Sequence, residues 1–176
     1  TDDQRRRWLP AMATGEVIGS FALTEPEAGS DAGSLRTSAR RDGDGWVLNG
    51  TKRYITNAPQ ADLFTVFART NPDEAGAKGV SAFLVPAETP GISLGAKDRK
   101  MGQQGAHVCD VIFEDCRVPG DALLGGEANL HGGFRTAMKT LDRGRLHISA
   151  LSVGCAERLI ADSLAYAAER RQFGQP

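Results

Sequence analysis

Short apolar runs alternate with clusters of turn residues over the first two thirds of the chain. Between residues 17 and 118, runs rich in β-branched and aromatic residues recur between clusters of Gly, Pro, Asn and Asp, a texture typical of short strands. We expect strands at 17–23, 37–41, 45–49, 52–56, 63–68, 80–86, 91–94 and 108–114. Seven or eight short strands over about a hundred residues predict an antiparallel sandwich or barrel.

The strongest hairpin signal in this region is the pair Asn49-Gly50. Asn-Gly suits the positive φ angles of a two-residue hairpin turn, and apolar segments flank it on both sides. The pair therefore predicts a turn between the strands expected at 45–49 and 52–56.

Helical character is confined to the two ends of the chain. Residues 2–9 resemble the end of a helix, which Pro10 and Gly15 then interrupt. After a Gly-rich connector at 120–133, apolar residues recur at helical spacing over 134–173. A helix of about 40 residues would be about 60 Å long, more than a small barrel can cover. We therefore expect its apolar face to need helices absent from this chain, which would be either a piece of a longer protein or one protomer whose helical partners lie in other chains.

Composition and charge exclude several classes of protein. The chain has 21 basic and 22 acidic residues and is 40% hydrophobic, so it lacks the basic excess of a nucleic-acid-binding protein. No segment approaches the roughly 18 apolar residues of a membrane span, and no signal-peptide pattern is visible. The three cysteines are too widely spaced for a disulfide framework or a metal knuckle and indicate a reducing compartment. The three histidines lie in separate segments, so we expect no metal site.

The sequence has no phosphate-loop, zinc-protease, nucleophile-elbow or dinucleotide-binding motif. Three polar clusters remain as candidates for a functional site. Residues 24–31 gather hydroxyls and carboxylates in a loop that could bind a phosphate or a heterocycle edge, or could be an ordinary turn. Tyr54 and Thr56 share a strand face, where they could stack on a flat ligand or form an ordinary strand pair. Residues 169–174 place arginines at the end of the long helix, suiting either the helix dipole or a phosphate.

Taken together and in order, the motifs resemble the acyl-CoA dehydrogenase family over essentially the whole chain. They are WLP at 8–10, TGE at 14–16, FALTEPEAGSD at 21–31, WVLNGTKRYITN at 46–57, KMG at 100–102, FEDCRVP at 113–119, LDRGR at 141–145 and RRQFG at 170–174. The resemblance implies a mixed α and β fold. It places the end of a helical N-terminal domain at 1–16 and a middle β-barrel domain that binds FAD and acyl-CoA at 17–119. Residues 120–176 would be a connector and the first long helix of a truncated C-terminal helical bundle.

The same resemblance implies an FAD site and a CoA-thioester site. Residues that match flavin-lining positions are Phe21, Thr24, Gly29, Ser30, Tyr54 and Thr56. Of these, Thr24 would bond the pyrimidine edge, Tyr54 would replace the usual Trp beside the isoalloxazine, and Thr56 would approach N5. Residues that match contacts to the FAD of a neighbouring subunit are Arg170, Gln172 and Phe173, and those that match contacts to the thioester are Ser30, Asp142 and Arg145.

The implied reaction is the α,β-dehydrogenation of an acyl-CoA to the trans-2-enoyl-CoA, with electrons passed to an electron-transfer flavoprotein. A homotetramer or dimer is implied, in the cytoplasm of a bacterium or in the mitochondrial matrix of a eukaryote. The glutamate base is expected beyond residue 176, because the family's other position for it, on the long helix, is Gly144 here. The segment 102–109 departs from the family pattern, and His107 receives no role.

Two other functions stay open at this point. Another flavoenzyme on the same scaffold, such as an acyl-CoA oxidase, a nitroalkane oxidase or a flavin monooxygenase, would share the fold. The isolated chain could also be an inert binding or assembly module, retaining little FAD without its helical partners.

Overall fold

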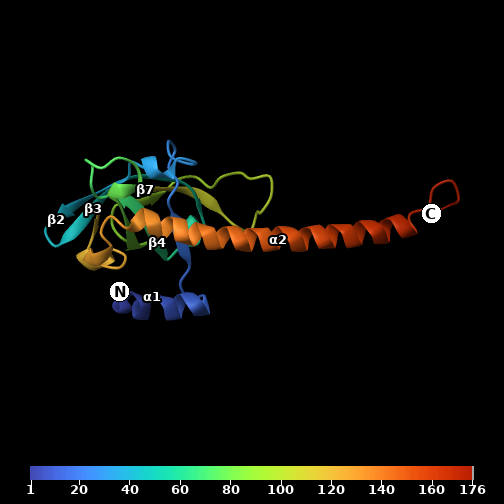
Figure 1. Ribbon diagram of the computed structural model, residues 1–176, viewed down its shortest axis with the longest axis horizontal. Helices are drawn as coiled ribbons and strands as arrows, with labels where there is room; N and C mark the ends of the chain where they lie inside the picture. Colours follow the sequence, from blue (N-terminus) through green and yellow to red (C-terminus); the bar gives the residue numbers. More distant parts are fainter. Residues whose placement is uncertain (176) are drawn as a thin grey trace. The chain divides into compact units, whose positions relative to one another are not determined.

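The computed structural model describes residues 1–175, which divide into two compact units, residues 1–137 and the residues from Met138 onward. Within this described part, seven strands of the first unit form one curled sheet (Figure 1). They are β1 (Gly19–Ala22), β2 (Ser38–Asp42), β3 (Gly45–Thr56), β4 (Leu63–Arg69), β5 (Val80–Pro86), β6 (Ile92–Leu94) and β7 (Val108–Val118). The sheet order is β1-β4-β2-β3-β7-β6, and β5 pairs with β4.

The predicted fold class is confirmed, with one refinement of strand direction. The pairs β2–β3, β3–β7, β4–β5 and β6–β7 are antiparallel, as predicted, but β1–β4 and β2–β4 are parallel. Strands β4 and β5 read as nearly continuous apolar runs because most of their side chains on both faces are buried. Phe64, Phe83 and Phe113 are among the side chains of this core, and Trp46 packs edge-on against Phe83 at 5.4 Å between ring centroids.

The hairpin predicted at Asn49-Gly50 is wrong. Strand β3 runs through both residues without a turn, and the chain reverses instead between Asp42 and Gly45. The Asn49 side chain bonds Asp115 on β7, where the register with β3 shifts. Gly50 is required by close packing, since a Cβ there would lie 2.5 Å from the Thr37 hydroxyl oxygen.

A second register shift between β3 and β7 redirects the side chains of β3. The shift falls between Lys52 and Ile55 and places an extra residue on β3, with Tyr54 at φ 58°. A bulge of this kind changes which face a side chain meets. As a result Lys52 and Ile55 are buried, whereas Tyr54 and Thr56 are exposed.

The first helix, α1 (Asp2–Thr14), continues past Pro10, which the sequence had marked as an interruption. Thr1 and Gln4 form a capping box at its start, and Gly15 ends it in the left-handed conformation. The Gln4 side-chain amide donates to the carbonyls of Asp121 and Leu123 at 2.8 Å each. Short 3-10 helices occur at Ala32–Ser34, Ala58–Gln60, Gly76–Gly79, Gly120–Ala122 and Glu127–Asn129.

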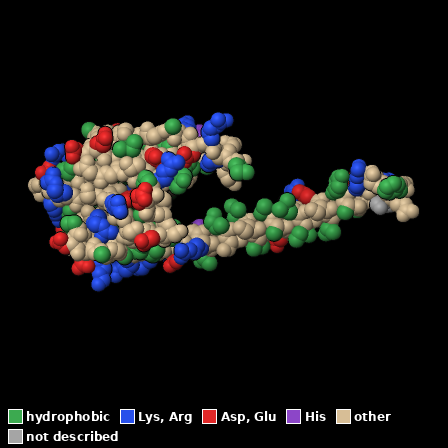
Figure 2. Space-filling view, turned by 90° about the horizontal axis from the view of Figure 1, so that it is seen from above, with side chains coloured by type: hydrophobic (Ala, Val, Ile, Leu, Met, Phe, Trp, Pro, Cys, Tyr) green, Lys and Arg blue, Asp and Glu red, His purple; other side chains and the backbone are tan. Residues whose placement is uncertain are grey.

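The second helix, α2 (Gly133–Glu169), starts in the first unit and accounts for most of the second. Gly133 lies against the backbone of Ser81 and Ala82, where a larger residue would collide. The helix ends at Glu169, four residues before the predicted end near Phe173. Exposed apolar side chains line the second unit's part of the helix (Figure 2), namely Leu146, Ile148, Leu151, Val153, Leu159, Ile160, Leu164 and Tyr166. Neither helix in the described residues has the length and apolarity needed to cross a membrane.

Candidate functional site

The structure distributes the predicted site residues between the two units. Phe21, Thr24, Gly29, Ser30, Tyr54 and Thr56 lie in the first unit, and Asp142, Arg145, Arg170, Gln172 and Phe173 lie in the second. Within the first unit these residues come from only two segments: strand β1 with the loop that follows it, and the end of strand β3. We call residues 24–37 the β1–β2 loop.

Direct hydrogen bonds hold these two segments together. The backbone N–H of Arg53 donates to the Thr24 carbonyl at 2.8 Å, and the Ser20 hydroxyl donates to the Thr56 carbonyl at 2.6 Å. The loop begins with a tight turn in which Glu25 and Ala28 exchange backbone hydrogen bonds. The start of the β1–β2 loop is therefore fixed against the bulged end of β3.

The exposed side of this junction has the groups that a flat heterocycle needs. Tyr54 is 62% exposed, and the hydroxyls of Thr24, Ser30 and Thr56 have no hydrogen-bond partner among residues 1–175. Gly29 has open space beside its Cα, so the backbone there can approach a ligand closely. An aromatic ring and unpaired hydroxyls fit the ring and the polar edge of a flavin. Phe21 is half-buried and packs on Phe67 at 4.9 Å between ring centroids.

A buried ion pair lies behind this junction. Lys52 Nζ is 2.7 Å from Glu25 Oε1 and also donates to the Leu23 carbonyl at 3.1 Å. The Lys52 side chain is fully buried and that of Glu25 is 6% exposed. Glu25 also accepts from the backbone N–H groups of Arg36, at 2.6 Å, and Thr37, at 2.9 Å. We call Lys52 and Glu25 the buried pair.

Burial and pairing act in opposite directions on the pKa values of the buried pair. Burial lowers the pKa of Lys52 to about 8, although the neighbouring Glu25 carboxylate opposes this shift. Burial alone would raise the pKa of Glu25, but the charge of Lys52 and the hydrogen bonds that the carboxylate accepts lower it overall. Glu25 is therefore held as the carboxylate at neutral pH.

Arg69 fixes the far part of the β1–β2 loop. Its guanidinium and Nε donate to the carbonyls of Gly33, at 2.9 Å, and Leu35, at 3.2 Å, and also to Glu74 and Gly76 of the neighbouring loop. The loop that carries Gly29 and Ser30 is thus tied down at both ends by charged side chains bonded to backbone groups.

A second charged cluster, next to the buried pair in the sequence, supports Tyr54. Arg53 donates to both carboxylate oxygens of Asp110, at 2.8 and 2.9 Å, and lies 3.5 Å from Asp98. The Arg53 guanidinium stacks 4.6 Å above the centre of the Tyr54 ring. Cation–π contact of this kind restrains an exposed aromatic ring.

His107 also has a structural explanation in the first unit. Its Nδ1 lies 2.5 Å from the Gln60 side-chain nitrogen, and its carbonyl accepts from the Asn57 N–H at 2.7 Å. These contacts join the end of β3 to the segment before β7.

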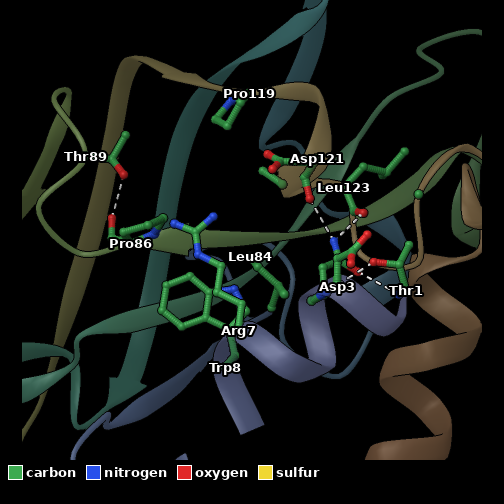
Figure 3. Close-up of a pocket in the computed structure, with 13 residues that line it drawn as sticks. Thr1, Asp3, Arg7, Trp8, Leu84, Pro86, Thr89, Pro119, Asp121 and Leu123 are labelled. Carbon is green, nitrogen blue, oxygen red and sulfur yellow. Dashed lines mark hydrogen bonds between the residues drawn. The ribbon is translucent and has the colours of Figure 1, made fainter. Parts of the chain in front are cut away.

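A groove lies elsewhere on the first unit, beside α1 (Figure 3). Its volume is about 470 Å³, and Trp8, Leu84 and Leu123 are among its lining residues. Gln4, which also lines it, donates hydrogen bonds to the carbonyls of two other lining residues, Asp121 and Leu123. The groove has none of the predicted site residues in its lining.

In the second unit, the predicted residues form two local groups. Asp142 and Arg145 make an ion pair of 2.7 Å one turn apart on α2, with both side chains exposed. Arg170, Gln172 and Phe173 follow the end of the helix, in a turn where Gln172 and Gln175 exchange backbone hydrogen bonds and Phe173 has φ 53°. The arginines at 170 and 171 are therefore beyond the helix, and not in its last turn as predicted.

The sequence reasoning missed the buried pair. Both residues belong to the motifs that carried the resemblance, but neither received a role. A signal was available, since simple alternation along β3 places Lys52 on the same face as Trp46 and Leu48, which are apolar and buried. A lysine is almost never fully buried without a partner, so the pattern requires a carboxylate nearby.

Comparison with known proteins identifies the family. Residues 20–116 match the domain family described as "Acyl-CoA dehydrogenase, middle domain", and residues 131–176 match the family described as "Acyl-CoA dehydrogenase, C-terminal domain". The human short-chain specific acyl-CoA dehydrogenase of mitochondria is 47% identical over 99% of this chain, which covers 41% of that protein. A glutaryl-CoA dehydrogenase from Mycobacterium smegmatis, solved with FADH2, is 36% identical with a TM-score of 0.90, covering all of this chain and 43% of its own.

The prolyl acyl carrier protein oxidase AnaB is similar to the same degree. It is 41% identical with a TM-score of 0.89, over 99% of this chain and 45% of its own. The chain belongs to the acyl-CoA dehydrogenase family, as the motifs predicted. It spans less than half the length of the relatives that it matches.

Proposed function

We propose that the protein to which this chain belongs is an FAD-dependent acyl-CoA dehydrogenase, which converts an acyl-CoA thioester to the trans-2-enoyl-CoA. The observation that carries the proposal is the junction of the β1–β2 loop with the bulged end of β3. There the Tyr54 ring is exposed, and the hydroxyls of Thr24, Ser30 and Thr56 have no hydrogen-bond partner among residues 1–175. Gly29, in the same loop as Thr24 and Ser30, has open space beside it. The relatives named acyl-CoA dehydrogenase, and the one solved with FADH2, support the same assignment.

We assign the residues of the first unit to the flavin. Tyr54, restrained by Arg53, would lie against the isoalloxazine, and the hydroxyls of Thr24 and Thr56 would bond its pyrimidine edge and the N5 side. Phe21, Gly29 and Ser30 would complete the lining, with Ser30 also near the thioester. When bound, FAD would supply the hydride acceptor for the β-hydrogen of the substrate.

In this proposal the residues of the second unit bind the FAD of a neighbouring subunit and the CoA thioester. Arg170, Gln172 and Phe173 would contact the FAD of a neighbouring subunit in a homotetramer or dimer, since arginine suits pyrophosphate oxygens. Asp142 and Arg145 would contact the CoA thioester. We also propose the domain boundaries expected from the resemblance: the end of the N-terminal helical domain at 1–16, the middle β-barrel domain at 17–119, and the connector with the first C-terminal helix at 120–176.

The general base is not assigned within this chain. The slot on α2 that could hold it is Gly144, and the base would be a glutamate from another part of the protein, which removes the α-proton. Electrons would leave to an electron-transfer flavoprotein.

An oxidase is the second candidate. It is favoured by the prolyl acyl carrier protein oxidase, which at 41% identity is more similar to this chain than the glutaryl-CoA dehydrogenase solved with FADH2, at 36%, although less similar than the human dehydrogenase, at 47%. An oxidase would deliver the electrons to O₂, and its acyl group could be carried by a protein instead of CoA.

The test uses the full-length protein with a panel of acyl-CoA thioesters of different chain length. We expect bleaching of the flavin absorption without air, rapid reduction of an artificial electron-accepting dye, and little O₂ consumption. Thr56→Val should slow dye reduction, whereas Thr51→Val, on the same strand but outside the assigned site, should not. Turnover that consumes O₂ and spares the dye would replace the dehydrogenase with the oxidase, and a protein that binds no flavin would overturn both.

A further inference from the structure

One carboxylate closes the β1–β2 loop. Glu25, at its start, accepts hydrogen bonds from the N–H groups of Arg36 and Thr37 at its end, eleven and twelve residues along the chain. The two bonds use different oxygens, Oε2 for Arg36 and Oε1 for Thr37. The Glu25 side chain therefore closes residues 26–35, which include Gly29 and Ser30, into a loop whose far part Arg69 also holds through Gly33 and Leu35.

Lys52 connects the closed loop to strand β3. Its ammonium group bonds Glu25 and the Leu23 carbonyl, and the next residue of the strand, Arg53, bonds the Thr24 carbonyl through its N–H. Residues 23, 24 and 25 are thus each bonded to residue 52 or 53. The placement of Thr24 relative to Tyr54 and Thr56 depends on these bonds.

We infer that Glu25 and Lys52 are positioning residues of the proposed flavin site, holding the β1–β2 loop and the bulged end of β3 in the arrangement that the cofactor requires. The inference rests on the proposed function, because it concerns the affinity of that site for FAD. A loop ordered before binding pays no ordering entropy when the ligand arrives. The role belongs to the carboxylate itself, since two N–H donors and an ammonium group need an acceptor with two oxygens.

The test must separate positioning from stability, because either single substitution leaves one buried charge without a partner. We therefore compare Glu25→Gln, Lys52→Met and the double variant Glu25→Gln/Lys52→Met in the full-length protein. The double variant contains no unpaired charge, so its unfolding temperature should recover. Its glutamine still cannot accept from both Arg36 and Thr37, because one of the two carboxylate oxygens has become an NH₂ donor.

Two readouts follow the loop directly. Amide hydrogen exchange across residues 26–37 needs no cofactor, and titration of the apoprotein with FAD gives the dissociation constant. We expect Glu25→Gln and the double variant to exchange at least about tenfold faster in this segment and to bind FAD at least about tenfold more weakly, the scale of one or two charge-assisted hydrogen bonds. The bound flavin should also show a less resolved visible spectrum.

Two matched controls complete the set. Glu27→Gln makes the same chemical change at an exposed position of the same loop and should change neither readout. Val85→Ala, in the buried core on β5, should lower the unfolding temperature but leave loop exchange and FAD affinity at wild-type values.

The inference is overturned if the double variant regains FAD affinity along with its stability, or if exchange of residues 26–37 stays at the wild-type rate in Glu25→Gln. Failure of the proposed function looks different. The wild-type protein would then bind no FAD, while the exchange measurement would still report whether Glu25 closes the loop.

Discussion

Lys52 and Arg53 are neighbours on β3, yet they use their positive charges in two different environments. Lys52 is fully buried and faces Glu25, whereas the Arg53 side chain is 33% exposed and faces Asp110 and Asp98. After these two residues the bulge at Tyr54 shifts the register of β3. The next two side chains again point to opposite faces of the strand, with Ile55 buried and Thr56 exposed. Two ion pairs of similar length, 2.7 and 2.8 Å, therefore differ mainly in their access to water.

The stability lost when one partner of an ion pair is removed should therefore depend more on the burial of the pair than on its length. A charge that loses its partner in the core keeps the full desolvation cost, while one at the surface is solvated again. The buried pair therefore specifies one arrangement of the β1–β2 loop. Arg53, paired with Asp98 and Asp110, instead restrains the exposed Tyr54 ring by stacking on it. Both pairs support the same proposed site from opposite faces of one strand.

The largest expected effect is the loss of Lys52. Lys52→Met leaves the Glu25 carboxylate buried without its cation, which should lower the free energy of unfolding by about 3 to 5 kcal/mol. Urea unfolding of the full-length protein measures this, with Lys97→Met, at an exposed position, as the control. A loss no greater than that of the control would mean that Glu25 is satisfied by the backbone N–H groups alone.

The second effect is a loss of stability in acid that depends on Glu25. Its pKa in the folded protein is below the ordinary 4.5, so the unfolded chain takes up a proton first as the pH falls. The stability that this carboxylate contributes is complete above pH 4.5 and is lost as the pH passes down through the folded pKa.

Unfolding midpoints in a pH series from neutral to below pH 4.5 test this linkage. The wild-type protein should lose stability across the window more steeply than Glu25→Gln, in which the group cannot titrate. Parallel curves for the two proteins would mean that the carboxylate is no better stabilised in the folded protein than in the unfolded chain.

The strands and the family were predictable from the sequence because they depend on local patterns. Alternation and apolar runs located the seven strands of residues 1–175, although they divided β3 into two, and ordered motifs of several residues specified the family. The error at Asn49-Gly50 has a tertiary cause: the pair has the chemistry of a turn, but Asn49 bonds Asp115 and Gly50 admits Thr37. Contacts between residues so far apart in the sequence leave no local signal.

The site was predictable in its residues but not in its construction. Tyr54 and Thr56 were expected on one face from simple alternation, and both are exposed, although the bulge shifts the register between Lys52 and Ile55. The pairing of Lys52 with Glu25 was not predicted, because it joins residues 27 positions apart across two segments. A bulge and a long-range ion pair both depend on the partner strand, which the pattern along one strand does not contain.

A smaller effect is expected from Arg53. Arg53→Met removes the contacts to Asp110 and the Tyr54 ring, and we expect a lower unfolding midpoint than wild type but a much smaller loss than in Lys52→Met. Added salt should shrink the effect of Arg53→Met, because water and ions reach this pair, and leave that of Lys52→Met nearly unchanged. Arg40→Met, at an exposed position on β2, is the control, and an equal salt response of the two variants would contradict the contrast.

The smallest effect belongs to an ion pair whose two side chains are both mostly exposed. Arg158 and Asp162 lie one turn apart on α2 with Nε–Oδ2 at 2.8 Å, and their side chains are 79% and 58% exposed. A double-mutant cycle of Arg158→Met and Asp162→Asn should give a coupling of about 0.3 to 0.5 kcal/mol. Its length of 2.8 Å is close to the 2.7 Å of Lys52 to Glu25. A coupling near that of the buried pair would therefore mean that geometry, and not access to water, sets the strength of ion pairs in this protein.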